Sequence, residues 1–157
     1  MEELKNKMNQ VKEQQKSIVV KSFTNAEAFD LGSYIYEKAL KEGKPVAISV
    51  TRNRQKLFYA ATEGTTVEND HWVMRKENAV YFFNKPTFET GLYMQIRNDN
   101  IWDKYGLERG EYSQNGGCIP IMAEGFGMIG TATVSGMSQA EDHIFVTEAV
   151  LEWISKQ

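Results

Sequence analysis

The glycine-rich stretch GFGMIGTATVSG, residues 125–136, most constrains what this chain can fold into. It contains the spacing G-x-G-x-x-G at Gly125, Gly127 and Gly130. In a dinucleotide-binding fold these glycines follow a strand and open a helix, whose N-terminus holds the pyrophosphate. Here the segment that leaves the glycines, residues 131–134, reads Thr-Ala-Thr-Val, and its alternating β-branched residues indicate a strand. The stretch is therefore predicted to be a glycine-marked turn or bulge that feeds a strand.

The remainder of the chain also argues against a dinucleotide fold. That fold needs further parallel strands and an acidic residue about 20 positions downstream that reaches a ribose. Only residues 135–157 remain, and most of them indicate one helix. Glu148 and Glu152 would lie on that helix, in the wrong element for the role.

The composition limits the class of protein. A chain of 157 residues with 41% hydrophobic residues fits one domain with one core. The formal net charge of -3 provides no basic field, which argues against nucleic acid and acidic membrane surfaces as partners. The N-terminus has no apolar signal segment, and no window approaches the roughly 20 apolar residues of a membrane span. A cytoplasmic location is expected.

Cysteine and histidine are scarce. The one cysteine, Cys118, excludes an internal disulfide and a site with several cysteine ligands. It follows two glycines in the stretch NGGCIP, residues 115–120, which predicts a sharp turn into a strand. No feature places either histidine, His71 or His143, near the thiol, so Cys118 is predicted to be a buried small apolar residue and not a nucleophile. No metal site is expected.

Helix signals recur along the chain. Residues 1–16 carry a narrow apolar stripe, Leu4, Met8 and Val11, which predicts a helix that packs on the body or on a neighbouring subunit. Capping-box patterns at residues 24–27 and 138–141 predict two helix starts. The first of these helices is expected to end at Glu42, before Gly43. The predicted helices after the first cover residues 25–42, 68–83, 87–97 and 144–154.

Alternating apolar residues predict five strands. These cover residues 17–21, 46–52, 56–61, 119–122 and 128–134, and the second and third are close enough for a hairpin. Hairpin-linked strands with helices grouped between them predict an α+β domain, in which an antiparallel sheet of about five strands is flanked by helices.

The stretch NDHWVMRK, residues 69–76, is the first candidate for ligand chemistry. In a helix Trp72, Arg75 and Lys76 share a face, where an indole beside two cations can clamp a planar anionic ligand. The alternative is that Trp72 belongs to the core and that the cations are solvated or pair with Glu68 and Glu77.

The stretch SGMSQAEDH, residues 135–143, is the second candidate. Glu141 and Asp142 occupy a first helical turn, where carboxylates offset the helix dipole, and that capping role alone explains them. His143 continues the apolar stripe of the helix and is expected to be partly buried. A buried histidine is usually structural, but this one is also the best general acid or base, or axial metal ligand, that the chain offers.

Three motifs together resemble one known family. They are GTTVENDHWVMRK at 64–76, GGCIPI at 116–121 and GMIGTATVSGMSQAEDH at 127–143. They resemble the GlcG/HbpS-like family, also called the haem-degrading domain family, and most closely its branch of small uncharacterised proteins. The resemblance covers nearly the whole chain, from about residue 29 to the last helix.

The resemblance implies a profilin-like domain that forms homodimers or higher oligomers. Some relatives bind haem, one is reported to degrade it, and a related domain is joined to cobalamin adenosyltransferases. The glycines at 125–130 would then lie near the ligand pocket. The family's motif residues, if they line a pocket, correspond here to Asn69, Asp70, Trp72, Arg75, Lys76, Ser135, Gly136, Glu141, Asp142 and His143.

The chain departs from the family branch at two places. Pro86-Thr87 stands where the branch has a serine pair, and Ile119 stands where an aromatic residue often precedes the proline. Both changes affect expected walls of the pocket. His71 lies at a variable position of its motif and receives no role.

Three functions follow from these features. In the first, the protein binds a small anion or a tetrapyrrole such as haem, with Arg75 and Lys76 at the propionates and His143 at the iron. In the second, it is a non-enzymatic assembly module, in which an ion-pair network lies at a subunit contact. The third is an enzyme for an unidentified small metabolite. The network of the second function would consist of Asp70, Arg75, Lys76, Glu141 and Asp142.

Overall fold

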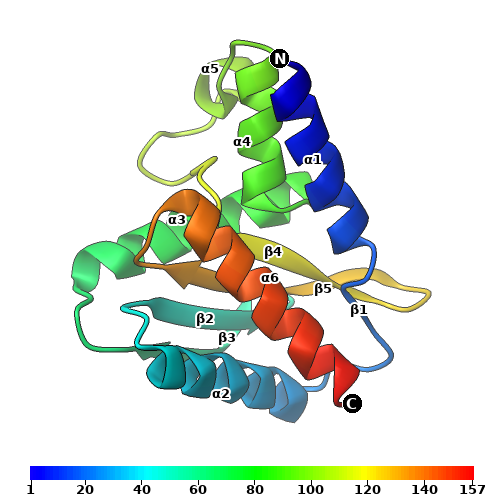
Figure 1. The fold of residues 1–157 in the computed structure, drawn as a ribbon, viewed down its shortest axis with the longest axis vertical. Coiled ribbons are helices and arrows are strands. Elements are labelled where there is room, and N and C mark those ends of the chain that lie inside the picture. Colours follow the sequence, from blue (N-terminus) through cyan, green and yellow to red (C-terminus); the bar gives the residue numbers. More distant parts are fainter.

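The computed structural model describes all of residues 1–157, which form six helices and one five-stranded sheet (Figure 1). In chain order the elements are α1 (Glu2–Gln15), β1 (Val19–Val20), α2 (Asn25–Glu42), β2 (Ala47–Arg52), β3 (Gln55–Ala61), α3 (Val67–Phe83), α4 (Thr87–Ile96), α5 (Ile101–Tyr105), β4 (Cys118–Ala123), β5 (Gly127–Ser135) and α6 (Gln139–Ser155). The predicted α+β class, with a sheet flanked by helices, is confirmed.

Capping residues set the helix ends where the sequence predicts them. Thr24 and Glu27 form the capping box of α2, and Gly43 ends that helix in the left-handed conformation with φ 66°. Ser138 and Glu141 form the equivalent box of α6. Each box satisfies two backbone amides that a helix start otherwise leaves without a partner.

The sheet has the order β1-β4-β5-β2-β3 and is mixed. Three neighbouring pairs are antiparallel, as predicted, and β2 and β3 form the expected hairpin. The short β1 pairs in parallel with the edge of β4, so that Val19 lies opposite Met122. Strand direction at an edge depends on how the chain arrives there, which periodicity does not encode.

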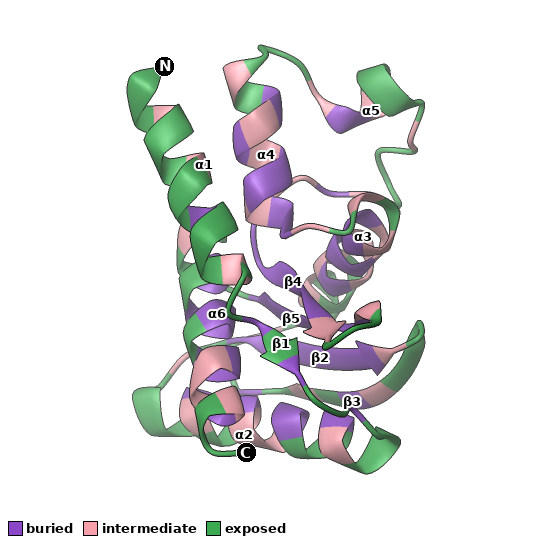
Figure 2. Ribbon diagram, turned by 90° about the vertical axis from the view of Figure 1, so that its right-hand side faces the viewer, coloured by how far each residue is buried: buried purple, intermediate pink, exposed green.

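The two faces of the sheet differ in chemistry. One face presents Ile48, Val50, Ile119 and Val134 to α2 and α6, and these residues belong to the main hydrophobic core. In Figure 1, α2 runs along one side of the sheet and α6 crosses in front of it. The buried purple segments in Figure 2 gather on the sheet and on the inward faces of its helices.

The opposite face is buried and polar. Ser49 donates a hydrogen bond to Glu77 of α3 over 3.2 Å, and the hydroxyl groups of Thr51 and Tyr81 lie 2.6 Å apart. Because these hydrogen bonds satisfy buried and half-buried polar groups, they fix the position of α3 on the sheet.

The glycines of the opening stretch are turn and strand residues, as predicted. Gly125 and Gly127 have φ values of 73° and 110° at the connection between β4 and β5. No helix follows them. They begin β5 at one end, whereas the candidate motif at Ser135 lies at the other end, roughly 25 Å away at about 3.3 Å per residue. The expectation of a nearby ligand pocket is therefore wrong for Gly125 and Gly127.

The first helix packs on the body of the protein. α1 lies beside α4 (Figure 1), with Val11 buried and Leu4 and Met8 half-buried. The predicted stripe thus contacts α4, and a role at a subunit contact stays a prediction. No helix combines the length and the apolar character needed to cross a bilayer.

A substitution at Gly130 tests how closely β5 approaches β2. A Cβ at this position would lie 2.1 Å from the carbonyl oxygen of Thr51, which belongs to the neighbouring strand. We expect Gly130→Ala to lower the free energy of unfolding by about 1–3 kcal/mol, because the sheet must shift to admit the methyl group. Gly110→Ala, where a Cβ meets nothing within 4 Å, is the matched control in urea unfolding. Equal stability of the two variants would contradict this packing.

Candidate functional site

A cleft of about 290 Å³ lies where the first turns of α3 and α6 meet the end of β5. The loop before β4 supplies one further wall. Only two of the ten lining residues are hydrophobic, so the cleft is a polar site. The lining residues are Glu68, Asn69, Trp72, Lys76, Asn115, Ser135, Gly136, Met137, Gln139 and Asp142.

A buried ion pair lies at this cleft. Lys76 Nζ donates to Asp142 Oδ2 over 3.1 Å and to the carbonyl oxygen of Val134 over 3.2 Å. The side chains of Lys76 and Asp142 are only 4% and 2% exposed. Asp142 also accepts hydrogen bonds from the backbone amides of Gly136 and Met137, at 3.3 and 3.0 Å. The pair therefore ties α3 to the connection between β5 and α6.

Burial and attraction act against each other in this pair. Burial lowers the pKa of Lys76 and raises the pKa of Asp142, because each charge loses its hydration. Their mutual attraction opposes both shifts, and the two amides favour the charged carboxylate. The charges are thus neutralised locally, and the cleft keeps no strong excess of either sign from this pair.

Two glycines make room for the lysine and the neighbouring helix. A Cβ on Gly117 would lie 2.5 Å from Lys76 Nζ, and one on Gly116 would lie 2.7 Å from the carbonyl oxygen of Gln139. The predicted turn at this glycine pair is therefore also a close packing point. Cys118 follows it and is fully buried, and burial raises the pKa of its thiol. The prediction that Cys118 is buried is confirmed.

Hydrogen-bond donors without partners in the chain line the cleft. The indole nitrogens of Trp102 and Trp153 donate to Tyr112 and Asp30, whereas Trp72 Nε1 donates to no group of the chain. Asn69 uses its side-chain oxygen to cap α3, and Gln139 uses its own to accept from Gly116. Their amide nitrogens remain available.

The first predicted motif forms in part. The Arg75 guanidinium stacks over the Trp72 ring at 4.3 Å, so the expected indole–cation pair exists. Trp72 is half-buried and lines the cleft, so it is not a core residue. The alternative in which the cations pair with Glu68 and Glu77 is also wrong. Lys76 pairs with Asp142, and the partner of Glu77 is Lys56, whose Nζ lies 3.5 Å from Glu77 Oε1.

Three predicted site residues lie outside the cleft. Asp70 accepts a hydrogen bond from Tyr59, and the exposed Glu141 caps α6. Arg75 stacks on Trp72 but does not line the cleft, and burial lowers the pKa of the Arg75 guanidinium. The proposed five-residue ion-pair network therefore does not form within the chain. Only the pair between Lys76 and Asp142 is present.

His143, the fourth predicted residue outside the cleft, lies behind an aromatic ring. It is 4% exposed, and its imidazole stacks on Phe88 with ring centroids 4.8 Å apart. Neither ring nitrogen has a hydrogen-bond partner. Burial lowers its pKa to about 4, so the ring is neutral at pH 7. The apolar stripe correctly predicts its burial but not what covers it.

The structure unites six of the predicted residues and adds four. Those united are Asn69, Trp72, Lys76, Ser135, Gly136 and Asp142, and those added are Glu68, Asn115, Met137 and Gln139. Each added residue belongs to a stretch that the sequence marks, namely the start of α3, the glycine turn or the second capping box. These added residues lie beside the predicted ones only because segments that are far apart in the sequence make contact. No three histidine, cysteine, aspartate or glutamate side chains gather as metal ligands.

Comparison with known proteins gives consistent matches. The family model described as "Haem degrading protein HbpS-like" matches residues 23–151. A UPF0303 protein of Burkholderia mallei (strain NCTC 10229) is 42% identical over 137 residues, which cover 87% of this chain and 83% of the relative.

Solved structures share the fold. The crystal structure of Ybr137w protein matches with a TM-score of 0.88 and 26% identity, over 96% of this chain and 89% of that one. The crystal structure of a PduOC:heme complex matches with a TM-score of 0.68 and 16% identity, over 85% of this chain and 94% of that one. At that identity the second match shows the fold alone.

The buried His143 predicts a pH dependence of stability. Its pKa is about 4 in the folded chain and about 6.5 in the unfolded chain, so the unfolded state binds the proton first as the pH falls. The contribution of the neutral ring to the free energy of unfolding is fully present above pH 6.5 and is lost as the pH falls to about 4. The difference between these two pKa values corresponds to about 3 kcal/mol of stability.

We expect His143→Leu to abolish most of this loss. The measurement is urea unfolding at pH 7 and pH 4, with the exposed His71 replaced by Gln as the control. If wild type and His143→Leu lost equal stability between these pH values, another group would be responsible.

Proposed function

We propose that this chain, which belongs to the HbpS-like family of haem-degrading proteins, is a small-molecule binding protein. The observation that supports the proposal is a polar cleft whose lining residues carry hydrogen-bond donors without partners in the chain. Trp72, Asn69 and Gln139 line it, and the Trp72 indole nitrogen and both side-chain amide nitrogens have no hydrogen-bond partner in the chain. The proposed ligand is a small planar carboxylate.

The local electrostatics favour an acceptor. α3 and α6 both begin at the cleft, and the positive end of a helix dipole favours negative charge there. Asp142, the buried acid, already accepts from Lys76 and two amides, so it does not repel a carboxylate as a free anion would. Glu68 is exposed and offers the remaining acidic group.

The size of the cleft sets an upper limit on the ligand. Pockets for drug-sized molecules have volumes of about 300–1,000 Å³. A cleft of about 290 Å³ therefore suits a small acid with a single ring, which the half-buried indole of Trp72 can stack against.

Benzoate tests this proposal, with benzyl alcohol as the uncharged analogue. We expect benzoate to shift the Trp72 indole and Asn69 side-chain amide resonances saturably in ¹H–¹⁵N spectra, and benzyl alcohol to bind at least about tenfold more weakly, a difference of about 1.4 kcal/mol. Asn69→Asp keeps the capping oxygen and replaces the donor with a carboxylate, so it should weaken benzoate binding to a similar degree.

Asn6→Asp, on the exposed side of α1, is the matched control for charge. A lack of saturable shifts at Trp72 with benzoate would refute the carboxylate site. Equal effects of the two aspartate variants would show that overall charge, and not the cleft, controls binding.

Haem is the second candidate ligand, because the PduOC structure with the same fold contains heme. The cleft does not fit it, since eight of ten lining residues are not hydrophobic and a porphyrin needs a broad apolar slot. His143, the expected iron ligand, is closed off by Phe88. We assign no catalytic residue, because His143 and Cys118 are both buried away from the cleft.

A haemin titration distinguishes the two candidates. We expect no saturable Soret shift at one site per chain, because neither the cleft nor the environment of His143 admits the macrocycle. The measurement uses tag-free protein and His143→Ala in parallel. A saturable shift that His143→Ala weakens would establish haem as a ligand and overturn this expectation.

A further inference from the structure

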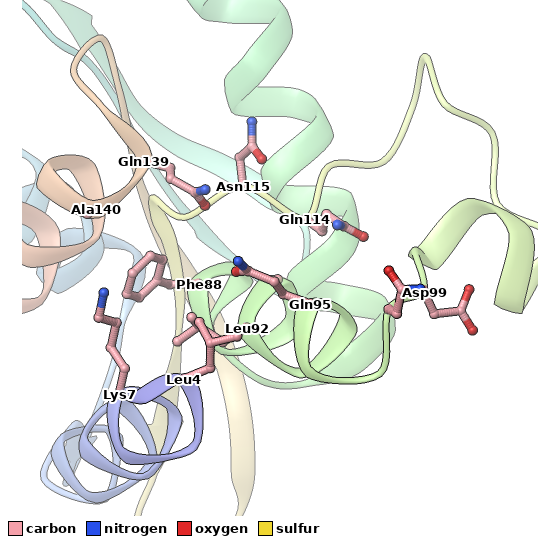
Figure 3. Close-up of a pocket in the computed structure, with 12 residues that line it drawn as sticks. Leu4, Lys7, Phe88, Leu92, Gln95, Asp99, Gln114, Asn115, Gln139 and Ala140 are labelled. Atoms are coloured by element: carbon pink, nitrogen blue, oxygen red, sulfur yellow. The ribbon is translucent and has the colours of Figure 1, made fainter. Parts of the chain in front are cut away.

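A second cavity, of about 490 Å³, lies between α1, α4 and the start of α6 (Figure 3). Its apolar part is formed by Leu4 of α1 together with Phe88 and Leu92 of α4. Gly91 lets the loop before β4 lie against α4, because a Cβ there would be 2.3 Å from the carbonyl oxygen of Gln114. The volume is within the range of small-molecule sites.

Five residues with carboxamide side chains line the cavity. Figure 3 shows Gln95 of α4 and Gln139 of α6 near Phe88 and Leu92, whereas Gln114 and Asn115 of the loop point away from these apolar side chains. Only two of the five carboxamide oxygens are engaged in the chain: that of Gln114 accepts from the amide of Ile101, and that of Gln139 accepts from the amide of Gly116. The five residues are Gln95, Asn98, Gln114, Asn115 and Gln139.

The charges of the cavity balance. Lys7 and Asp99 are its only charged lining residues, one of each sign. A carboxamide presents a donor and an acceptor side by side, and it pairs with a ring edge that carries the complementary groups, as Asn and Gln do with adenine. Phe88 adds an aromatic ring for stacking, and His143 holds that ring from behind.

We propose that this cavity binds a neutral, planar nitrogen heterocycle whose edge carries an adjacent donor and acceptor. It adjoins the polar cleft across Asn115 and Gln139, which line both cavities. The two proposals can be tested separately, because Asn69 and Trp72 line the cleft and do not line this cavity.

Adenosine is the probe, and purine riboside, which lacks the exocyclic amino group, is its matched analogue. In ¹H–¹⁵N spectra of labelled protein, adenosine should shift the side-chain amide resonances of Gln95 and Asn98 saturably and leave the Trp72 indole in place. We expect purine riboside to bind about fivefold or more weakly, because it loses one hydrogen bond. Equal affinity for the two probes, or no saturable shift with adenosine, would overturn the proposal.

Variants separate the cavity from unspecific stacking. Gln95 is exposed, so Gln95→Met should fold normally while it removes one carboxamide, and adenosine should bind it about fivefold more weakly. Gln10→Met makes the same change on α1 outside the cavity and should bind as wild type does. Shifts confined to the Trp72 indole would place adenosine in the cleft and would likewise refute this site.

Discussion

The buried pair of Lys76 and Asp142 is the interaction on which the geometry of the cleft depends. Removing both charges from water costs several kcal/mol, and such a pair is stable only when the remaining hydrogen-bonding groups are satisfied. Here the carbonyl oxygen of Val134 and the amides of Gly136 and Met137 supply those partners. Loss of one charge would leave the other buried alone, at a cost of about 3–5 kcal/mol. The pair thus holds the start of α6 against α3, and the cleft lies between them.

The polar face of the sheet makes that arrangement specific. An apolar face would let α3 slide over several equivalent positions, whereas hydrogen bonds between buried groups are satisfied in one position only. Ser49 and Thr51 of β2 meet Glu77 and Tyr81, which lie one turn apart on α3. This register places Lys76 at the end of β5. Burial raises the pKa of Glu77, and Lys56 opposes that shift across 3.5 Å. This face of the sheet therefore buries less apolar surface, but its hydrogen bonds fix the position of α3.

Local chemistry in the sequence predicts the elements well and their neighbours poorly. The capping boxes and Gly43 mark helix ends because each acts within a few residues. The spacing of Trp72 and Arg75 likewise predicts that they share a face of α3, where the structure stacks the guanidinium on the indole. The same reasoning fails for Asp70 and His143, whose partners Tyr59 and Phe88 lie on other elements. It also misses the parallel pairing of β1 and the place of Asn115 in the cleft, because both arise where distant segments meet.

The glycine pair at 116 and 117 joins the two cavities into one structural unit. Gly117 packs against Lys76 of the cleft, and a Cβ on Gly116 would lie 2.8 Å from the Phe88 ring of the second cavity. Gly116 also donates to Gln139, which lines both. A ligand that displaced Phe88 or Gln139 would therefore have to move the loop that carries Asn115 and thereby alter the wall of the cleft. By linkage, any such effect of one occupant on the affinity for the other must be equal in both directions. The stretch NGGC thus lies between the two cavities, and close contacts on both sides leave its glycines no room for a side chain.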